Sequence, residues 1–99
     1  MTAADLVGAR FALVFRADLE RRVSLSVVVG TVRRDGNRLM LDRGRRGVIT
    51  FRQSWLQRLK QPPSFMRRLF LGAEYFSLVE VERPPPDADL RWYIGDRPL

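Results

Sequence analysis

The side chains that carry out most protein chemistry are scarce in this chain. Its 99 residues include no histidine and no cysteine, which removes the usual general bases, thiol nucleophiles and transition-metal ligands. Carboxylates come close together along the chain at Glu80 and Glu82, and again at Asp87 and Asp89. The first pair is typical of a solvated strand face, and the second offers only two oxygens for a divalent ion. We therefore expect no enzyme, no cofactor and no metal.

Arginine is the chemically useful side chain that the sequence supplies in excess. The chain has 18 basic and 11 acidic residues, a net charge of +7, and Lys60 is its one basic residue other than arginine. The arginine fork pairs with phosphate and stacks on bases, although a GC-rich genome would also enrich arginine. Net charge bears on association and not on fold, and composition alone does not distinguish selection for phosphate binding from a GC-rich genome. The positions of the arginines are needed to distinguish the two.

Two groups of arginines fall at predicted connections between strands: Arg21 and Arg22 at the first connection, and Arg43, Arg45 and Arg46 at the third. In an up-and-down meander, the first and third connections lie at the same end, so the two groups would share one rim of a barrel. Gly44 and Gly47 would let the backbone approach a ligand, and their segment is similar to RGG segments that contact RNA. The alternative is that these are solvated loop charges, some neutralised by acidic neighbours. We expect nucleic-acid phosphates to be contacted here, by Arg21, Arg22, Arg43, Arg45 and Arg46. If about four phosphates are met, the log–log salt slope would be roughly −3 to −4.

The elements that would position these arginines are mainly strands. Apolar and polar residues alternate over residues 8–16 and again from residue 23, where Ser24 and Ser26 are expected to face outward. The alternation slips near Gly30, which predicts a bulge or bend. Helical spacing over residues 50–61 predicts a short helix that Pro62 and Pro63 end, with Trp55 in the core. Further strands are predicted over residues 37–42, 48–51 and 75–82.

These predictions combine into a mainly β fold. We expect residues 1–83 to form a five-stranded, partly open barrel, with one short helix inserted before the last strand. Residues 84–99 would form a C-terminal tail that starts with three prolines, which cannot join a strand ladder. We expect this tail to pack back on the domain or to meet a partner.

The order of elements resembles the SH3-like and Sm-like small barrels. The resemblance covers about residues 6–52 and is carried by Leu6-Val7-Gly8, Val29-Gly30-Thr31-Val32 and the turn Asp35-Gly36-Asn37. It implies an RNA-binding role for the turn residues Asp35 and Asn37. The likeness concerns the fold, which does not by itself set a function.

The same turn provides a second candidate contact for nucleic acid, formed by Arg33, Arg34, Asn37 and Arg38. The alternative is a hairpin turn with ordinary flanking charges. Arg34 and Arg38 also have the arginine spacing of the PilZ barrels that bind cyclic dinucleotides, but the second element of that motif is absent. An anionic second messenger or membrane headgroups therefore remain a third interpretation of the basic surface.

A protein-interaction or assembly module is the rival of nucleic-acid binding. An open barrel leaves strand edges that another chain can extend. The candidate surface comprises Phe76 and Leu78, on the face opposite Val79, and Trp92 and Tyr93 in the tail. The partner would be RNA or DNA in the first interpretation, and a second copy or another protein in the rival one.

No stretch of the sequence indicates a membrane or a secretory route. No apolar run approaches the ~18–20 residues that span a bilayer, and the first residues lack the pattern of a signal peptide. With no cysteine to mark an oxidising compartment, we expect a cytoplasmic protein.

Overall fold

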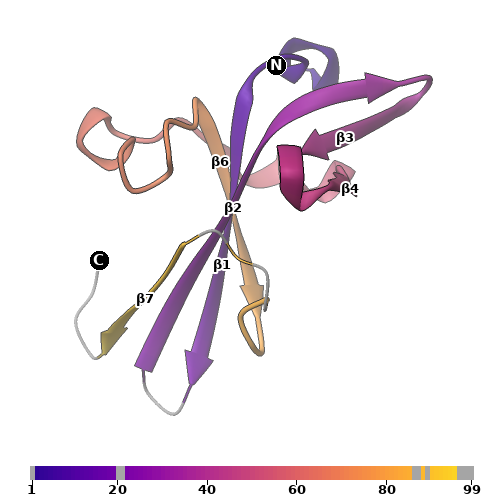
Figure 1. The fold of residues 1–99 in the computed structure, drawn as a ribbon. Helices are drawn as coiled ribbons and strands as arrows, with labels where there is room; N and C mark the ends of the chain where they lie inside the picture. The colour runs from indigo at the N-terminus through magenta and orange to yellow at the C-terminus, as the bar shows by residue number, and fades with distance from the viewer. Residues whose placement is uncertain (1, 20–21, 86–87, 89, 96–99) are drawn as a thin grey trace.

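The computed structural model describes residues 2–19, 22–85, 88 and 90–95, and for residues 90–95 it describes the backbone. These residues form strands and short 3-10 helices (Figure 1). In chain order they are η1 Ala3–Leu6, β1 Arg10–Leu19, β2 Arg22–Asp35, β3 Arg38–Asp42, η2 Gly44–Arg46, β4 Val48–Thr50, η3 Gln53–Arg58, β5 Leu59–Lys60, η4 Ser64–Met66, β6 Tyr75–Val81 and β7 Leu90–Gly95. Among the described residues, no helix is long and apolar enough to cross a membrane.

All the strands belong to one mixed sheet. Its order is β4-β3-β2-β1-β6-β5, and β7 pairs with β2 beside this path. β1 runs antiparallel to β2 and parallel to β6. β2 is 14 residues long, so its second edge pairs with β7 over Val23–Val27 and with β3 over Thr31–Asp35. No pairing of the described residues joins β4 to β5, and the sheet therefore stays open.

The mainly β class agrees with the sequence, but the predicted five strands and the barrel are not reproduced. The helical spacing over residues 50–61 becomes η3 followed by β5, which pairs with Ser77 and Phe76 of β6. The sequence could not distinguish these arrangements, because a 3-10 turn and a short strand bury Trp55 and half-bury Leu59 as an α-helix would. The second extra strand is β7, whose backbone packs back on β2.

Gly30 lies where the sequence predicted a bulge or bend in β2, but it pairs with Phe11 and the β1–β2 register continues through it without a bulge. It lies just before the part of β2 that pairs with β3. A Cβ atom at this position would come within 2.7 Å of the Asp42 carbonyl oxygen and 2.8 Å of Leu41 Cγ. Real Cβ atoms do not approach other atoms so closely, so only glycine lets β3 lie against β2 here.

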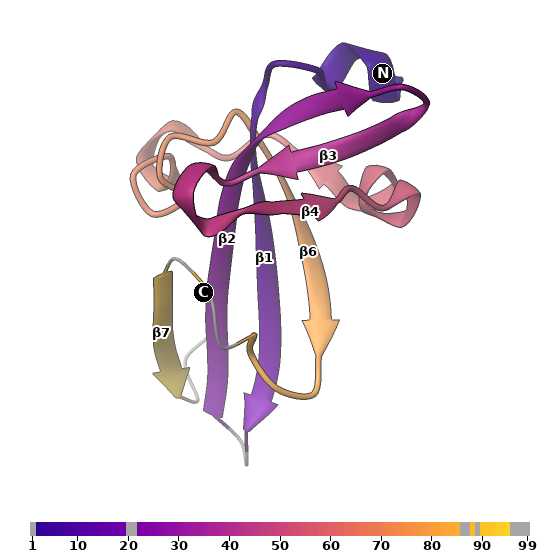
Figure 2. The ribbon, with the colours of Figure 1, turned by 45° about the vertical axis from the view of Figure 1, so that its right-hand side comes forward.

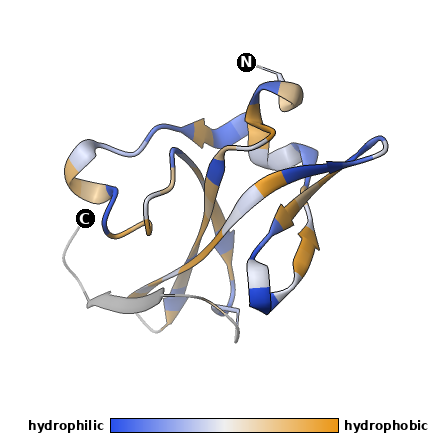
Figure 3. Ribbon diagram, turned by 45° about the horizontal axis from the view of Figure 1, so that its top comes forward, coloured by the Kyte–Doolittle hydropathy of each residue, from blue (hydrophilic) through white to orange (hydrophobic). Residues whose placement is uncertain are grey.

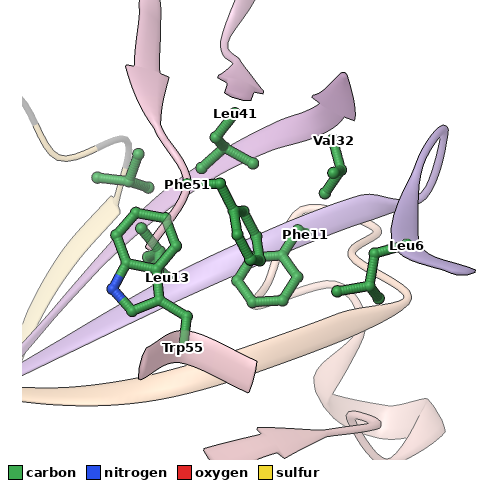
Figure 4. Packing of buried hydrophobic residues seen from close by; sticks show 8 residues of the cluster. Leu6, Phe11, Leu13, Val32, Leu41, Phe51 and Trp55 are labelled. Carbon is green, nitrogen blue, oxygen red and sulfur yellow. The ribbon is translucent and has the colours of Figure 1, made fainter. Parts of the chain in front are cut away.

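The sheet carries a hydrophobic cluster on each face. Alternation along β1 sends Phe11 and Leu13 to one face and Ala12 and Val14 to the other. The first cluster, seen in Figure 4, contains Leu6, Phe11, Leu13, Val28, Val32, Leu41, Phe51 and Trp55. Phe51 stands edge-on to Phe11 and to Trp55, with ring centroids 5.1 and 5.0 Å apart. The prediction that Trp55 belongs to the core is confirmed.

The second cluster is closed by the segment between β5 and β6. Phe70 and Ala73 from this segment join Ala12, Val14, Leu25, Val27 and Val29 of the two long strands. Phe76 and Leu78 are half-buried and pack against this cluster, and the Phe76 ring lies 4.9 Å from that of Phe70. These two members of the predicted interaction surface therefore contribute to packing within the chain.

Ser24 and Ser26 are completely buried, so the prediction that they face outward is wrong. They lie on the same sheet face as Val28, opposite Ala17 and Phe15. Ala88, in the connection between β6 and β7, packs against the cluster on this face. Alternation in a sequence signals exposure only where one face of a sheet is open, and here both faces are covered.

Candidate nucleic-acid interface

The strand register separates the two arginine groups that the sequence placed at one rim. Arg22 pairs with Leu19 at one end of the β1–β2 hairpin, whereas Asp42 pairs with Thr31, nine residues further along β2. At about 3.3 Å per residue, the two positions are about 30 Å apart. Figure 2 shows the end of β1 and the start of β2 at the lower end of the sheet and the chain after β3 well above them. The predicted juxtaposition is wrong, because β3 pairs only with the last third of β2. Arg21 lies outside the described residues.

The register brings together a different set of arginines. Arg10, Thr31 and Asp42 form one row across β1, β2 and β3, and Arg33 lies two residues beyond Thr31 on the same face. With Arg43, these residues line a depression of about 260 Å³ whose other lining residues are Val29, Gly30 and Gly44. We call this depression, with Arg10, Arg33 and Arg43 around it, the arginine pocket.

Backbone carbonyls orient two of these three arginines. Arg10 Nε donates to the Leu71 carbonyl oxygen at 3.0 Å, and Arg43 Nη2 donates to the Arg46 carbonyl oxygen at 2.8 Å. The Arg43 backbone N–H also donates to the Gly47 carbonyl at 2.9 Å. These two bonds orient the guanidinium groups, and because a carbonyl has no net charge the bonds themselves add no negative charge.

Asp42 is the one carboxylate among the residues that line the arginine pocket. Its Oδ1 accepts the Gly44 backbone N–H at 2.9 Å, and its Oδ2 lies 3.7 Å from Arg33 Nε. Both side chains of this ion pair are solvent-accessible, so the pairing is weak. Glu74 Oε1 also accepts the Arg10 backbone N–H at 3.5 Å beside the pocket, so three guanidinium groups against two carboxylates leave a surplus of positive charge.

The chain after β3 carries two further arginines of the first group. Gly44 and Gly47 adopt positive φ angles of 66° and 92°, a conformation that favours glycine. They enclose the single turn η2, which leaves Arg45 and Arg46 exposed beside the arginine pocket but outside its lining.

Only Arg33 of the second predicted group reaches the pocket. Arg34, Asn37 and Arg38 are exposed at the β2–β3 hairpin, where Arg34 Nε donates to the Gly36 carbonyl at 3.1 Å. Arg34 lies on the opposite face of the sheet from Arg33, because successive residues of a strand alternate.

The tail residues proposed for partner binding are part of the sheet. Trp92 pairs with Leu25, and Tyr93 with Ser24. Their backbone therefore covers the edge of β2 opposite β1.

No family model, curated protein or solved structure matches this chain. Its site is interpreted from geometry alone. The described residues contain no group of three carboxylates that could hold a metal ion. The chemically important feature of the site is the convergence of Arg10, Arg33 and Arg43 on one depression.

Arg10 is the pocket residue that the sequence analysis missed. It lies in the alternating segment over residues 8–16, and nothing in the sequence connected it to Arg33 or Arg43. Alternation predicts a residue's face but not its neighbours across the sheet, which depend on the register. A prediction of the β1–β2 and β2–β3 registers would have found it.

Proposed function

We propose that this chain binds nucleic acid through backbone phosphates at the arginine pocket, without reading the base sequence. The observation that carries the proposal is the convergence of Arg10, Arg33 and Arg43 on one depression of about 260 Å³. The arginine fork matches the geometry of phosphate oxygens. Two of the forks are held by backbone carbonyls, so little side-chain entropy is lost when an anion binds.

The surroundings of the pocket favour an extended polyanion over a small one. Arg45 and Arg46 are exposed on one side, and they add positive charge that attracts successive phosphates. Gly44 contributes lining without a side chain, and the space that a Cβ atom would take there is open, so a phosphate can approach the backbone closely.

The helices of the chain do not suit base-specific recognition. The longest described helix is η3, a 3-10 segment of six residues. Recognition of base sequence in the major groove usually relies on a longer helix or a two-stranded ribbon inserted into it. Contacts with phosphates set affinity and orientation and carry no sequence information.

Fluorescence anisotropy with labelled oligonucleotides at several salt concentrations tests the proposal. Affinity should fall steeply with salt, and loss of one phosphate contact should reduce the log–log slope by about 0.7–0.9. Arg33→Gln is the cleanest variant, because its side chain is 63% exposed and its one ion pair with a described residue is the weak pair with Asp42. Arg10→Gln and Arg43→Gln should act in the same direction.

Arg22→Gln is the matched control, since Arg22 is exposed at the far end of β2. It should change affinity less than Arg33→Gln. An affinity that ignores salt, or equal effects of the two variants, would contradict the arginine pocket as the phosphate site.

Protein interaction is the second candidate, and one observation favours it. β5 pairs only with Phe76 and Ser77, so among the described residues the outer edge of β6 from Leu78 to Val81 has no strand partner. A depression of about 330 Å³ lies here, lined in part by Arg52 and Arg58. Such an edge can accept an added strand. Light scattering at high micromolar concentration tests self-assembly, and a monomer under those conditions would exclude it.

A further inference from the structure

Phe65 is the exposed exception among the described aromatic side chains. It is 80% exposed, whereas every other aromatic side chain that the structure describes is buried or half-buried. Leu69 and Leu71, in the same segment, are 42% and 43% exposed. Contiguous apolar side chains in contact with water often mark a binding surface. We call residues 64–72 the Phe65 loop.

The Phe65 loop has a fixed conformation. The Met66 N–H donates to the Pro63 carbonyl at 2.8 Å, and the Gly72 N–H donates to the Arg67 carbonyl at 2.8 Å. Phe70 is only 3% exposed and fastens the loop to the second hydrophobic cluster. Figure 3 shows this segment, with its apolar and charged positions, projecting at one side of the molecule. Phe65 is therefore held in water by a folded scaffold.

Leu71 connects the Phe65 loop to the arginine pocket. Its φ angle of 52° is positive, which is strained for a leucine. In this conformation its carbonyl oxygen accepts the bond from Arg10 Nε at 3.0 Å. Arg67 and Arg68, which precede it in the loop, are exposed. The loop that presents Phe65 therefore contacts one pocket arginine and carries two further exposed arginines.

We propose that the nucleic acid bound here is single-stranded and that Phe65 stacks on one of its bases. This inference rests on the proposed function, and it adds the class of nucleic acid. In a duplex the bases are paired and stacked on one another, so an aromatic side chain reaches their faces only by forcing two base pairs apart, which costs a few kcal/mol. In a single strand the bases are free to stack on aromatic side chains, next to a basic surface that follows the phosphates.

The test compares one labelled single strand of about twelve nucleotides with a duplex of the same sequence. Wild type should bind the single strand more tightly at equal salt. Phe65→Ala should weaken single-strand binding by about 5- to 150-fold, the range for loss of one stacked base. It should leave duplex binding unchanged. Phe65→Trp should bind the single strand as tightly as wild type does, and the single strand should quench the fluorescence of the new tryptophan. A purely structural role of Phe65 would not produce this quenching.

Val48→Ala is the matched control, because Val48 is 51% exposed on β4, outside the loop. It should bind both ligands like wild type. If Arg33→Gln weakens binding while Phe65→Ala does not, the proposed function stands and the stacking inference fails. If neither ligand binds in a salt-dependent manner, the proposed function itself fails. Loss of binding to anionic vesicles in Phe65→Ala, with no effect on oligonucleotides, would assign the Phe65 loop to a lipid surface and overturn the inference.

Discussion

Gly30 shows how one residue determines the shape of the sheet. β2 pairs with β7 before this position and with β3 after it. Glycine within a strand and a slip in the alternation both single out this position in the sequence, but the bulge that they suggest is absent from the β1–β2 pairing. The close approach of Asp42 was not predictable, since it depends on which residue of β3 lies opposite.

Replacement of Gly30 by alanine should therefore destabilise the protein. The new methyl group would meet the Asp42 carbonyl at 2.7 Å, and overpacking of this kind costs about 1–3 kcal/mol. Urea unfolding measures the loss in the free energy of unfolding. Thr31→Ala, at the next position, removes atoms instead of adding them and should cost less. A Gly30→Ala protein as stable as wild type would mean that β3 does not lie so close.

The buried hydroxyls of Ser24 and Ser26 reduce the stability of the fold. Among the described residues, neither hydroxyl has a hydrogen-bond partner, and both side chains are completely buried. An unsatisfied buried hydroxyl costs about 1–3 kcal/mol.

Ser26→Ala should raise the free energy of unfolding by about 1 kcal/mol, because it removes the unsatisfied group. Thermal and urea unfolding both measure this change. Ser54→Ala, at an exposed position of η3, serves as the control and should leave stability unchanged. A less stable Ser26→Ala protein would show that the hydroxyl is satisfied.

At the scale of elements, β7 determines whether the C-terminal segment belongs to the folded unit. It covers the edge of β2 over Val23–Val27. Without β7, the backbone N–H and C=O groups of Val23–Val27 that point away from β1 would be unpaired. An unpaired strand edge of this kind promotes pairing between molecules.

A chain that ends at Arg83 should therefore be less stable than the full chain and should self-associate. Urea unfolding and light scattering measure the two effects. A chain that ends at Gly95 keeps β7 and should behave like the full chain. Equal stability and a monomeric state for the shorter chain would make residues 84–99 a tail outside the domain.

The sequence predicted the long strands better than the short elements. Alternation along a long strand is a strong signal, and it placed β1 and β2, of 10 and 14 residues, close to their observed positions. β5 has two residues, and β7 forms after three prolines because β2 offers an edge there. Elements of this kind are stabilised by tertiary pairing and leave little local pattern to detect.

At the scale of the whole molecule, the register decides which charges act together. The sequence supplied the residue type and two of the three pocket arginines, Arg33 and Arg43, but it assigned them to different ends. Arg10 joins them because β1 and β3 both pair with β2 near Thr31. A surplus of arginine is visible in composition, whereas its concentration at one place requires the pairing of three strands.

Binding through this charge should depend on salt but not on pH near neutrality. The chain has no histidine, and arginine stays protonated throughout this range. Oligonucleotide affinity at constant ionic strength should thus be equal at about pH 6 and about pH 8. A tenfold change between these values would point to a titrating group that the arginine pocket does not contain.

Protonation of Asp5, near the N-terminus, does not affect the comparison of oligonucleotide affinity at about pH 6 and about pH 8. The Thr2 backbone N–H, and then the Thr2 hydroxyl, lower the pKa of Asp5 below its ordinary value of 3.8. A carboxyl with a lowered folded pKa stabilises the fold above its unfolded pKa, and this contribution is lost as the pH falls through the folded value. It is therefore complete throughout the neutral range.

Amide chemical shifts test most directly whether the three arginines form one phosphate site. A ¹⁵N-labelled protein is titrated at low salt with a single-stranded oligonucleotide of about twelve nucleotides. The largest shifts are predicted at Arg10, at Gly30 and Thr31, and at Gly44, with none at Arg22. Shifts that are largest at Arg22, or that spread evenly over the exposed arginines, would contradict the arginine pocket.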